Sequence, residues 1–176
     1  MSLPDLALMN APLTALTASR GASGTLNDSL PAIGLRLMAA PGTDMNVQWS
    51  SPRDRLLQIN STPAVPADWF ALRLTLDIPD LSDIAGLGLW LRGAADPALT
   101  LQAVLRSAAG DTHVDSPLDR QILCHAATSD HTALWLRDRT PDLPTRADWR
   151  ELLLFLPAHR PITLSLHALR LFSVPA

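Results

Sequence analysis

The chain has 176 residues, a hydrophobic fraction of 47% and a formal net charge of −3, which suit one globular domain and exclude a disordered protein. All fourteen basic residues are arginines dispersed along the chain, so no basic stripe can follow a phosphate backbone and no nucleic-acid partner is expected. No apolar run reaches the length of a membrane span, and a single cysteine excludes an intramolecular disulfide.

The first segment, residues 1–33, is rich in Ala, Ser, Thr, Gly and Pro. This composition predicts a wrapping or loosely ordered segment, with one strand near residues 6–9. Pro4 and Asp5 interrupt its apolar part and no basic stretch precedes them, which is atypical of a signal peptide. A cytoplasmic location is therefore the default expectation, and a module from a longer secreted chain is the alternative. The abundance of Ala, Leu, Arg and Pro without Lys or Tyr is typical of a GC-rich bacterial genome.

The second segment, residues 34–176, alternates short apolar runs with turn residues, which predicts a β-sandwich domain. The period-two pattern is clearest in residues 70–78, where Phe70 and every second residue after it are apolar. The same pattern recurs over 87–92, 99–106, 134–137 and 150–156, with leucine at the inward positions. The last strand, 162–171, changes phase near His167, which predicts a β-bulge. Weaker strand candidates are 35–38, 47–49, 55–59 and 120–125.

Two phrases occur twice: ADW at 67–69 and 147–149, and LWLR at 89–92 and 134–137. Each ADW precedes an apolar strand that ends in proline, and each LWLR fits a strand with Leu inward and Trp and Arg outward. Pairs of similar long strands in a two-sheet sandwich explain both repeats, and convergence within a leucine-rich chain is the alternative. The predicted fold is all-β, a two-sheet antiparallel β-sandwich (jelly roll) with at most short helical turns.

From Trp69 to the C-terminus the pattern resembles the jelly-roll sandwich of galactose-binding-like domains and many carbohydrate-binding modules. The segments WFALRLTLDIP, DWRELLLFLP and ITLSLHALRLF carry this resemblance. The resemblance implies that exposed aromatic side chains together with Arg, Asn, Gln or His hold a sugar, and that a structural calcium accompanies the fold. The chain has no tyrosine and no recognisable calcium loop, so its own residues predict no cofactor.

The Leu-inward register places six side chains of binding character on outward faces: Trp90, Arg92, Gln102, Arg106, Trp135 and Arg137. Indole rings stack on the apolar face of a sugar, and guanidinium and amide groups hydrogen-bond to hydroxyls or carboxylates. The sequence therefore predicts a non-catalytic carbohydrate-binding module, and the arginines favour acidic glycans. The alternative for each tryptophan is cover by an arginine stem or a neighbouring loop.

A second outward surface is apolar. The register of strand 150–156 places Trp149, Leu153 and Phe155 on the solvent side. An apolar face of this size requires cover, either by the N-terminal thirty residues or by a partner protein. The alternative function is therefore a protein-interaction or assembly module, with homo-oligomerisation as one form of it.

The remaining reactive side chains match no catalytic or metal signature. Cys124 and His125 are neighbours on a predicted strand and face opposite sides, so they cannot form a dyad. Asp77, Asp80 and Asp83 lie within two residues of proline or serine, in a context where aspartate serves turns and helix caps. A third alternative, a jelly-roll enzyme acting on a polysaccharide, therefore lacks an evident acid pair, and no metal site is predicted.

Overall fold

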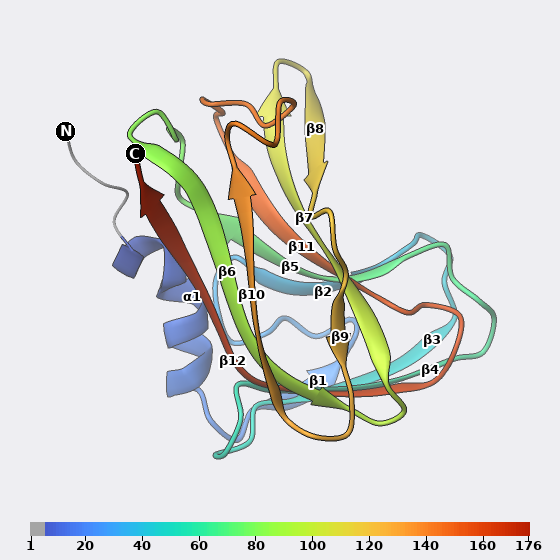
Figure 1. Cartoon of the computed structure of the whole chain (residues 1–176). Coiled ribbons are helices and arrows are strands. Elements are labelled where there is room, and N and C mark those ends of the chain that lie inside the picture. The colour runs from blue at the N-terminus through green and yellow to red at the C-terminus, as the bar shows by residue number, and fades with distance from the viewer. Residues whose placement is uncertain (1–5) are drawn as a thin grey trace.

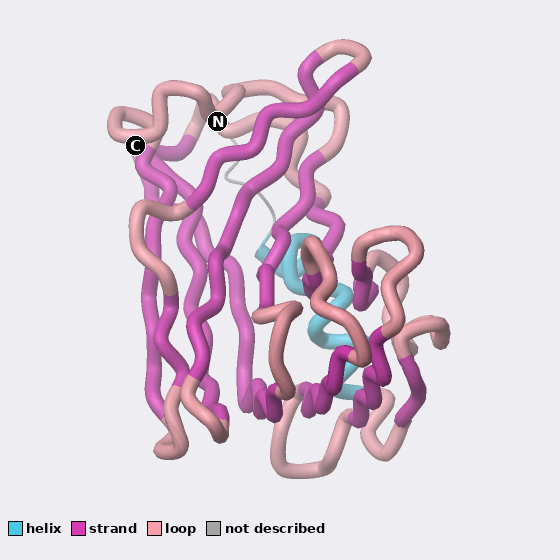
Figure 2. Tube along the Cα trace, turned by 90° about the vertical axis from the view of Figure 1, so that its right-hand side faces the viewer, coloured by secondary structure: helices cyan, strands magenta, loops and turns pink. Residues whose placement is uncertain are grey.

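A computed structural model describes residues 6–176 and shows two antiparallel sheets packed face to face with one helix beside them (Figure 1). Sheet A has the strand order β1-β3-β4-β12-β6-β10, and sheet B has the order β2-β5-β11-β7-β8, with β9 pairing to β7. Outside the helix, the described chain consists of strands and connecting loops (Figure 2). The predicted two-sheet antiparallel sandwich is confirmed.

The strands of sheet A are β1 (Ser23–Thr25), β3 (Met45–Ser50), β4 (Leu57–Pro63), β6 (Ile84–Ala95), β10 (Ser129–Leu136) and β12 (Ile162–Pro175). The strands of sheet B are β2 (Leu35–Ala39), β5 (Phe70–Leu76), β7 (Leu99–Ala109), β8 (Thr112–Pro117), β9 (Ile122–Cys124) and β11 (Arg150–Leu156). Strand β8 was not predicted, because most of its side chains are exposed and show no apolar alternation. The pairing of β12 with β6 shifts register between Leu166 and Ala168, which confirms the predicted bulge.

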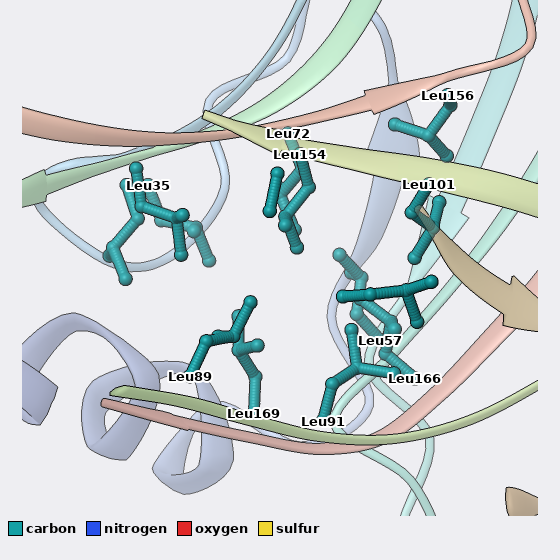
Figure 3. Close-up of a cluster of buried hydrophobic side chains, with 14 of the residues drawn as sticks. Leu35, Leu57, Leu72, Leu89, Leu91, Leu101, Leu154, Leu156, Leu166 and Leu169 are labelled. Atoms are coloured by element: carbon teal, nitrogen blue, oxygen red, sulfur yellow. The ribbon is translucent and has the colours of Figure 1, made fainter. Parts of the chain in front are cut away.

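Leucine side chains from the two sheets meet to form the core (Figure 3). Alternation points Leu72 of β5 and Leu154 of β11 away from solvent on one sheet. It points Leu89 of β6 and Leu169 of β12 toward them from the other sheet. Each of these side chains is at most 4% exposed, and burying one contributes about 1.5–3 kcal/mol to folding.

The N-terminal residues form a helix where the sequence predicted a strand. Helix α1 spans Leu6–Ala18 and buries Met9, Leu13 and Leu16 in the core, so the prediction of a strand near residues 6–9 is wrong. The spacing of these three residues puts them on one helix face, and Ala and Thr occupy most of the other faces. Within residues 6–176, no helix is long and apolar enough to cross a bilayer. Residues 1–5 lie outside the described residues, and the division of the chain at residue 33 stays a prediction.

Asn10 of α1 joins the helix to β12. Strand β12 pairs with β4 only through Leu166, so its later residues present one edge that no described strand covers. The Asn10 amide takes the place of a strand there: its Nδ2 donates to the Leu171 carbonyl, and its Oδ1 accepts from the Leu171 N–H, both at 2.9 Å. This pairing satisfies backbone groups that an open edge would leave free to recruit another chain.

Candidate functional site

Strand alternation gives the outer face of sheet B its character. In β5, Ala71 and Arg73 point outward, and in β11 the outward residues are Glu151, Leu153 and Phe155. The register pairs Arg73 with Leu153 and Ala71 with Phe155, so these side chains lie next to one another across the two strands. This face therefore combines an apolar floor with charged groups.

The outer face of sheet B holds a groove of about 320 Å³, called here the sheet-B groove. It is lined by Met38, Trp69, Ala71, Arg73, Arg106, His113, Trp149, Glu151, Leu153 and Phe155.

Two tryptophans lie at opposite ends of the sheet-B groove. Trp69 directly precedes β5 and Trp149 directly precedes β11, and these two strands run antiparallel with Arg150 opposite Leu76. Eight strand positions separate the two ends, which corresponds to roughly 25 Å between their backbones. Trp149 is 40% exposed, so part of its ring is open to a ligand.

Two ion pairs supply the polar groups of the sheet-B groove. The Arg73 guanidinium donates to Glu151, and the Arg106 guanidinium forms a bidentate pair with Asp115, with both N···O distances at 2.7 Å. The Arg106 hydrogen bond lowers the pKa of Asp115, and the same bond raises the pKa of Arg106. Each arginine charge is thus balanced by a carboxylate, and the pairs offer both donors and acceptors to a ligand.

Arg150 anchors the end of the sheet-B groove that carries Trp149. Its side chain is fully buried and its guanidinium donates to the carbonyls of Ile78 (2.9 Å), Pro144 (2.6 Å) and Thr145 (3.1 Å) and to the Ser107 hydroxyl (2.6 Å). Burial lowers the pKa of Arg150 to about 10, so the group stays charged at neutral pH. These bonds hold the long loop before β11 against its neighbours.

No protein-family model matches the chain, and no curated protein matches it in sequence. Solved structures share its architecture. The family 11 carbohydrate-binding module of a Clostridium thermocellum cellulosomal cellulase is 10% identical, with a TM-score of 0.53 over 89% of this chain and 96% of that one. The N-terminal cellulose-binding domain of Cellulomonas fimi β-1,4-glucanase C is 13% identical, with a TM-score of 0.54 over 89% of this chain and 97% of that one.

The CBM22-1 xylan-binding domain from Paenibacillus barcinonensis is 11% identical, with a TM-score of 0.53 over 89% of this chain and 97% of that one. The fold is that of carbohydrate-binding modules. The resemblance inferred from the strand pattern is thereby confirmed at the level of the fold.

The structure does not bring the six predicted ligand-binding residues of this module-like domain together. Trp90 and Arg92 lie on the outer face of sheet A, where Arg170 stacks over the Trp90 ring at 5.8 Å from its centroid. Trp135 is buried, at 1% exposure, and its indole N–H donates to the Ser116 carbonyl at 2.8 Å. The prediction that Trp135 faces solvent is wrong, because β10 sits one residue out of the predicted phase.

Arg137, Gln102 and Arg106 are also separated. Arg137 follows β10 and donates to the carbonyls of Ser82 (2.9 Å) and Ile84 (3.1 Å), so it fastens a turn. Gln102 and Arg106 lie on the outer face of β7 in sheet B, where Gln102 donates to the Leu118 carbonyl. Arg106 is therefore the one predicted ligand-binding residue that lines the sheet-B groove.

The predicted apolar interaction face lies in the sheet-B groove. Trp149, Leu153 and Phe155 all line it, with Leu153 buried and Phe155 partly buried among neighbouring side chains. None of the lining residues comes from residues 6–33, so the described N-terminal segment does not supply the predicted cover. Whether a partner protein binds this face stays a prediction.

Sequence reasoning missed Trp69, Arg73 and Glu151 as groove residues. The repeated ADW phrase was the available signal, because it places a tryptophan just before each of two long strands. What the phrase could not reveal is that the two strands are neighbours in one sheet.

The remaining candidate groups do not form a reactive centre. Cys124 is buried, and burial raises its pKa to about 11. Within residues 6–176, no three His, Cys, Asp or Glu side chains are arranged to hold a metal ion. The calcium ion implied by the resemblance therefore has no such side-chain cluster here.

Proposed function

We propose that the chain is a non-catalytic carbohydrate-binding module that holds an extended, neutral glycan in the sheet-B groove. The observation that carries this proposal is the pair Trp69 and Trp149 at opposite ends of one groove, with ion-paired arginines between them. Indole rings bind the apolar faces of sugar rings, and charged groups hydrogen-bond to the hydroxyls at the ring edges. A chain of several sugars is needed to reach both tryptophans.

The charge balance of the sheet-B groove favours a neutral ligand. The sequence favoured acidic glycans because of arginines that prove to lie on different surfaces. Glu151 and Asp115 already neutralise the two arginines that line the groove, Arg73 and Arg106. A carboxylate or sulfate on the ligand would have to displace one of these acids from its arginine, at the cost of an existing charge-assisted hydrogen bond.

The same ion pairs speak against hydrolysis in the groove. A glycosidase needs one carboxylic acid with a raised pKa and a second carboxylate placed across the scissile bond. Arg106 lowers the pKa of Asp115, and Glu151 is engaged by Arg73. Asp115 is thus not prepared to donate a proton, and the Glu151 carboxylate is occupied by the Arg73 guanidinium.

Structures with this fold add support. One family 11 module is described in complex with a β-1,3-1,4-mixed-linked tetrasaccharide, and two other neighbours are described as xylan-binding and cellulose-binding domains. We carry over only the broad class, neutral polysaccharides with extended chains, as the first probes.

The test is isothermal titration of the wild type and of the Trp69→Ala, Trp149→Ala and Trp90→Ala variants with neutral and acidic oligosaccharides of increasing length. We expect neutral chains to bind, and each of the first two substitutions to weaken binding at least tenfold. Trp90→Ala removes an indole from the opposite sheet and serves as the matched control, so its affinity for neutral chains should stay unchanged.

Absence of binding to any saccharide by the folded wild type would refute the proposal. If the wild type also self-associates in solution and Trp149→Ala makes it monomeric, the groove is the protein-interaction face instead. Equal weakening by all three substitutions would place the ligand outside the sheet-B groove.

A further inference from the structure

A second groove is lined by residues of α1 and β12. Figure 1 shows these two elements beside each other. This helix groove has a volume of about 550 Å³ and is lined by one face of α1, by Leu56, and by residues 167–170 of β12. Asn10 fixes the helix to β12 through the two hydrogen bonds with Leu171, so the two walls are held in place.

Basic side chains stand at both ends of the helix groove. Arg170 lines it at the Asn10 end, and Arg20 and His167 line it at the other end. Asn10 and Arg20 are ten residues apart on or just beyond the helix, which corresponds to about 15 Å. Among the described residues that line this groove, none is Asp or Glu.

The contacts of these basic groups leave their charge uncompensated within the described structure. Arg20 is held in place by carbonyl groups, with Nη1 donating to Pro52 at 2.9 Å, and Arg170 contacts the Trp90 ring. Neither arginine forms an ion pair with a carboxylate of residues 6–176. Asp54, the acid that interacts with His167, is itself paired with Arg55 at 2.7 Å.

The bulge in β12 shapes the middle of the helix groove. Because the register with β6 shifts between Leu166 and Ala168, His167 is an extra residue that leaves the regular alternation. Its ring lines the groove, and its Nε2 lies 3.4 Å from the Thr128 hydroxyl. Threonine hydroxyls of α1, from Thr14 and Thr17, line the opposite wall.

We propose that the helix groove is a second ligand site, for an oligosaccharide that carries anionic groups such as carboxylates or sulfates. Guanidinium groups recognise both kinds of anion with charge-assisted hydrogen bonds, and cations at both ends suit a chain with repeated charges. Strand addition by an acidic peptide is blocked at Leu171, because the Asn10 amide already occupies that part of the β12 edge. The surface that remains offers hydroxyls, guanidinium groups and the nearby Trp90 ring, which suit a sugar.

The experiment titrates the full chain with an oligogalacturonate, as the carboxylated probe, and with a sulfated dextran oligosaccharide, as the sulfated probe. The variants are Arg170→Gln and its matched control Arg92→Gln, which removes the same charge from the adjacent strand of the same sheet face without touching the groove. Both arginines are exposed, so both variants should keep the wild-type circular dichroism spectrum and melting temperature.

We expect at least one probe to bind the wild type, with an affinity that falls steeply with salt and that Arg170→Gln weakens at least tenfold. Arg92→Gln and Trp149→Ala should bind as the wild type does, and whichever probe binds identifies the anion. No binding of either probe, or equal weakening by Arg170→Gln and Arg92→Gln, would overturn the proposal. If Trp149→Ala abolished binding of the anionic probe, the probe would be bound in the sheet-B groove instead. If oligoglutamate competed with the probe equally well, the helix groove would be a site for acidic peptides. Because neutral glycans are tested separately, failure here leaves the proposed function standing.

Discussion

Arg150 offers a direct test of how a buried charge holds the loop beside Trp149. In Arg150→Met, a side chain of similar length replaces the guanidinium, and four acceptors lose their donor. Hydrogen bonds from a charged donor contribute about 1.5–3 kcal/mol each. Desolvation opposes them: it lowers the pKa of Arg150 to about 10, which corresponds to about 3 kcal/mol.

The four bonds exceed this cost, so we expect Arg150→Met to reduce the free energy of unfolding by about 3 kcal/mol. Urea denaturation followed by tryptophan fluorescence and far-ultraviolet circular dichroism measures the change. Arg146→Met is the control, because Arg146 lies in the same loop but is exposed and pairs only with Asp80. A decrease in the free energy of unfolding below about 1 kcal/mol for Arg150→Met, or an equal decrease for both variants, would contradict this expectation. It would show that the cost of desolvating the charge cancels the gain from its hydrogen bonds.

Three further predictions concern other parts of the molecule. Gly86→Ala should lower the melting temperature, because an added Cβ would lie 2.6 Å from the backbone carbonyl oxygen of Trp135; overpacking of this kind costs about 1–3 kcal/mol, and an unchanged melting temperature would contradict the packing described. Cys124 should react with a thiol reagent at pH 8 only after denaturation, since burial raises its pKa to about 11; rapid reaction of the native protein would contradict this. Because Arg106 lowers the pKa of Asp115 below 3.8, the pair should stabilise the fold above that value and lose its effect as pH falls through the lowered pKa. Arg106→Gln should return the Asp115 titration, followed by NMR, to its ordinary range, and an unchanged titration would refute the assignment.

The strand pattern predicted most of the sandwich because one face of each long strand is buried. In residues 70–78 polar and small residues separate the apolar ones, so only one register buries the apolar set. In β10 the pattern is ambiguous: Leu134 and Leu136 alternate with Ala133 and Trp135, and both sets are apolar. The structure buries Trp135 and leaves Leu134 42% exposed, a one-residue shift that moves every side chain to the other face.

Helix α1 could not be predicted from periodicity for a related reason. Its buried residues, Met9, Leu13 and Leu16, have helical spacing, but Leu8 and several alanines occupy the exposed surface. Without charged residues on the outer side, the contrast between the two faces is weak. Pro12 weakens the helical signal further, because proline is unfavourable in a helix interior.

The position of the sheet-B groove could not be predicted from the strand pattern. Which strands become neighbours is decided by the packing of the whole sandwich, so the approach of Trp69 and Trp149 to one groove is a property of the β5–β11 pairing. Alternation alone does place each of them on an outward face. The sequence therefore predicted which side chains of sheet B face outward, but it did not predict which strands lie next to each other.

The antiparallel pairing of β5 with β11 gives the sheet-B groove a local pseudo-twofold axis, which passes near the paired residues Arg73 and Leu153. Rotation about this axis exchanges the two ADW phrases and thus exchanges Trp69 with Trp149. Under the proposed function, the two indoles would therefore present similar stacking surfaces to a polysaccharide that lies in the groove in either direction. The centre of the groove breaks the symmetry, because Arg73 has a leucine as its counterpart and Glu151 has Ala71. The ion pairs alone would then decide in which direction a polysaccharide lies in the groove. The spacing of the two tryptophans would decide how long the bound polysaccharide must be.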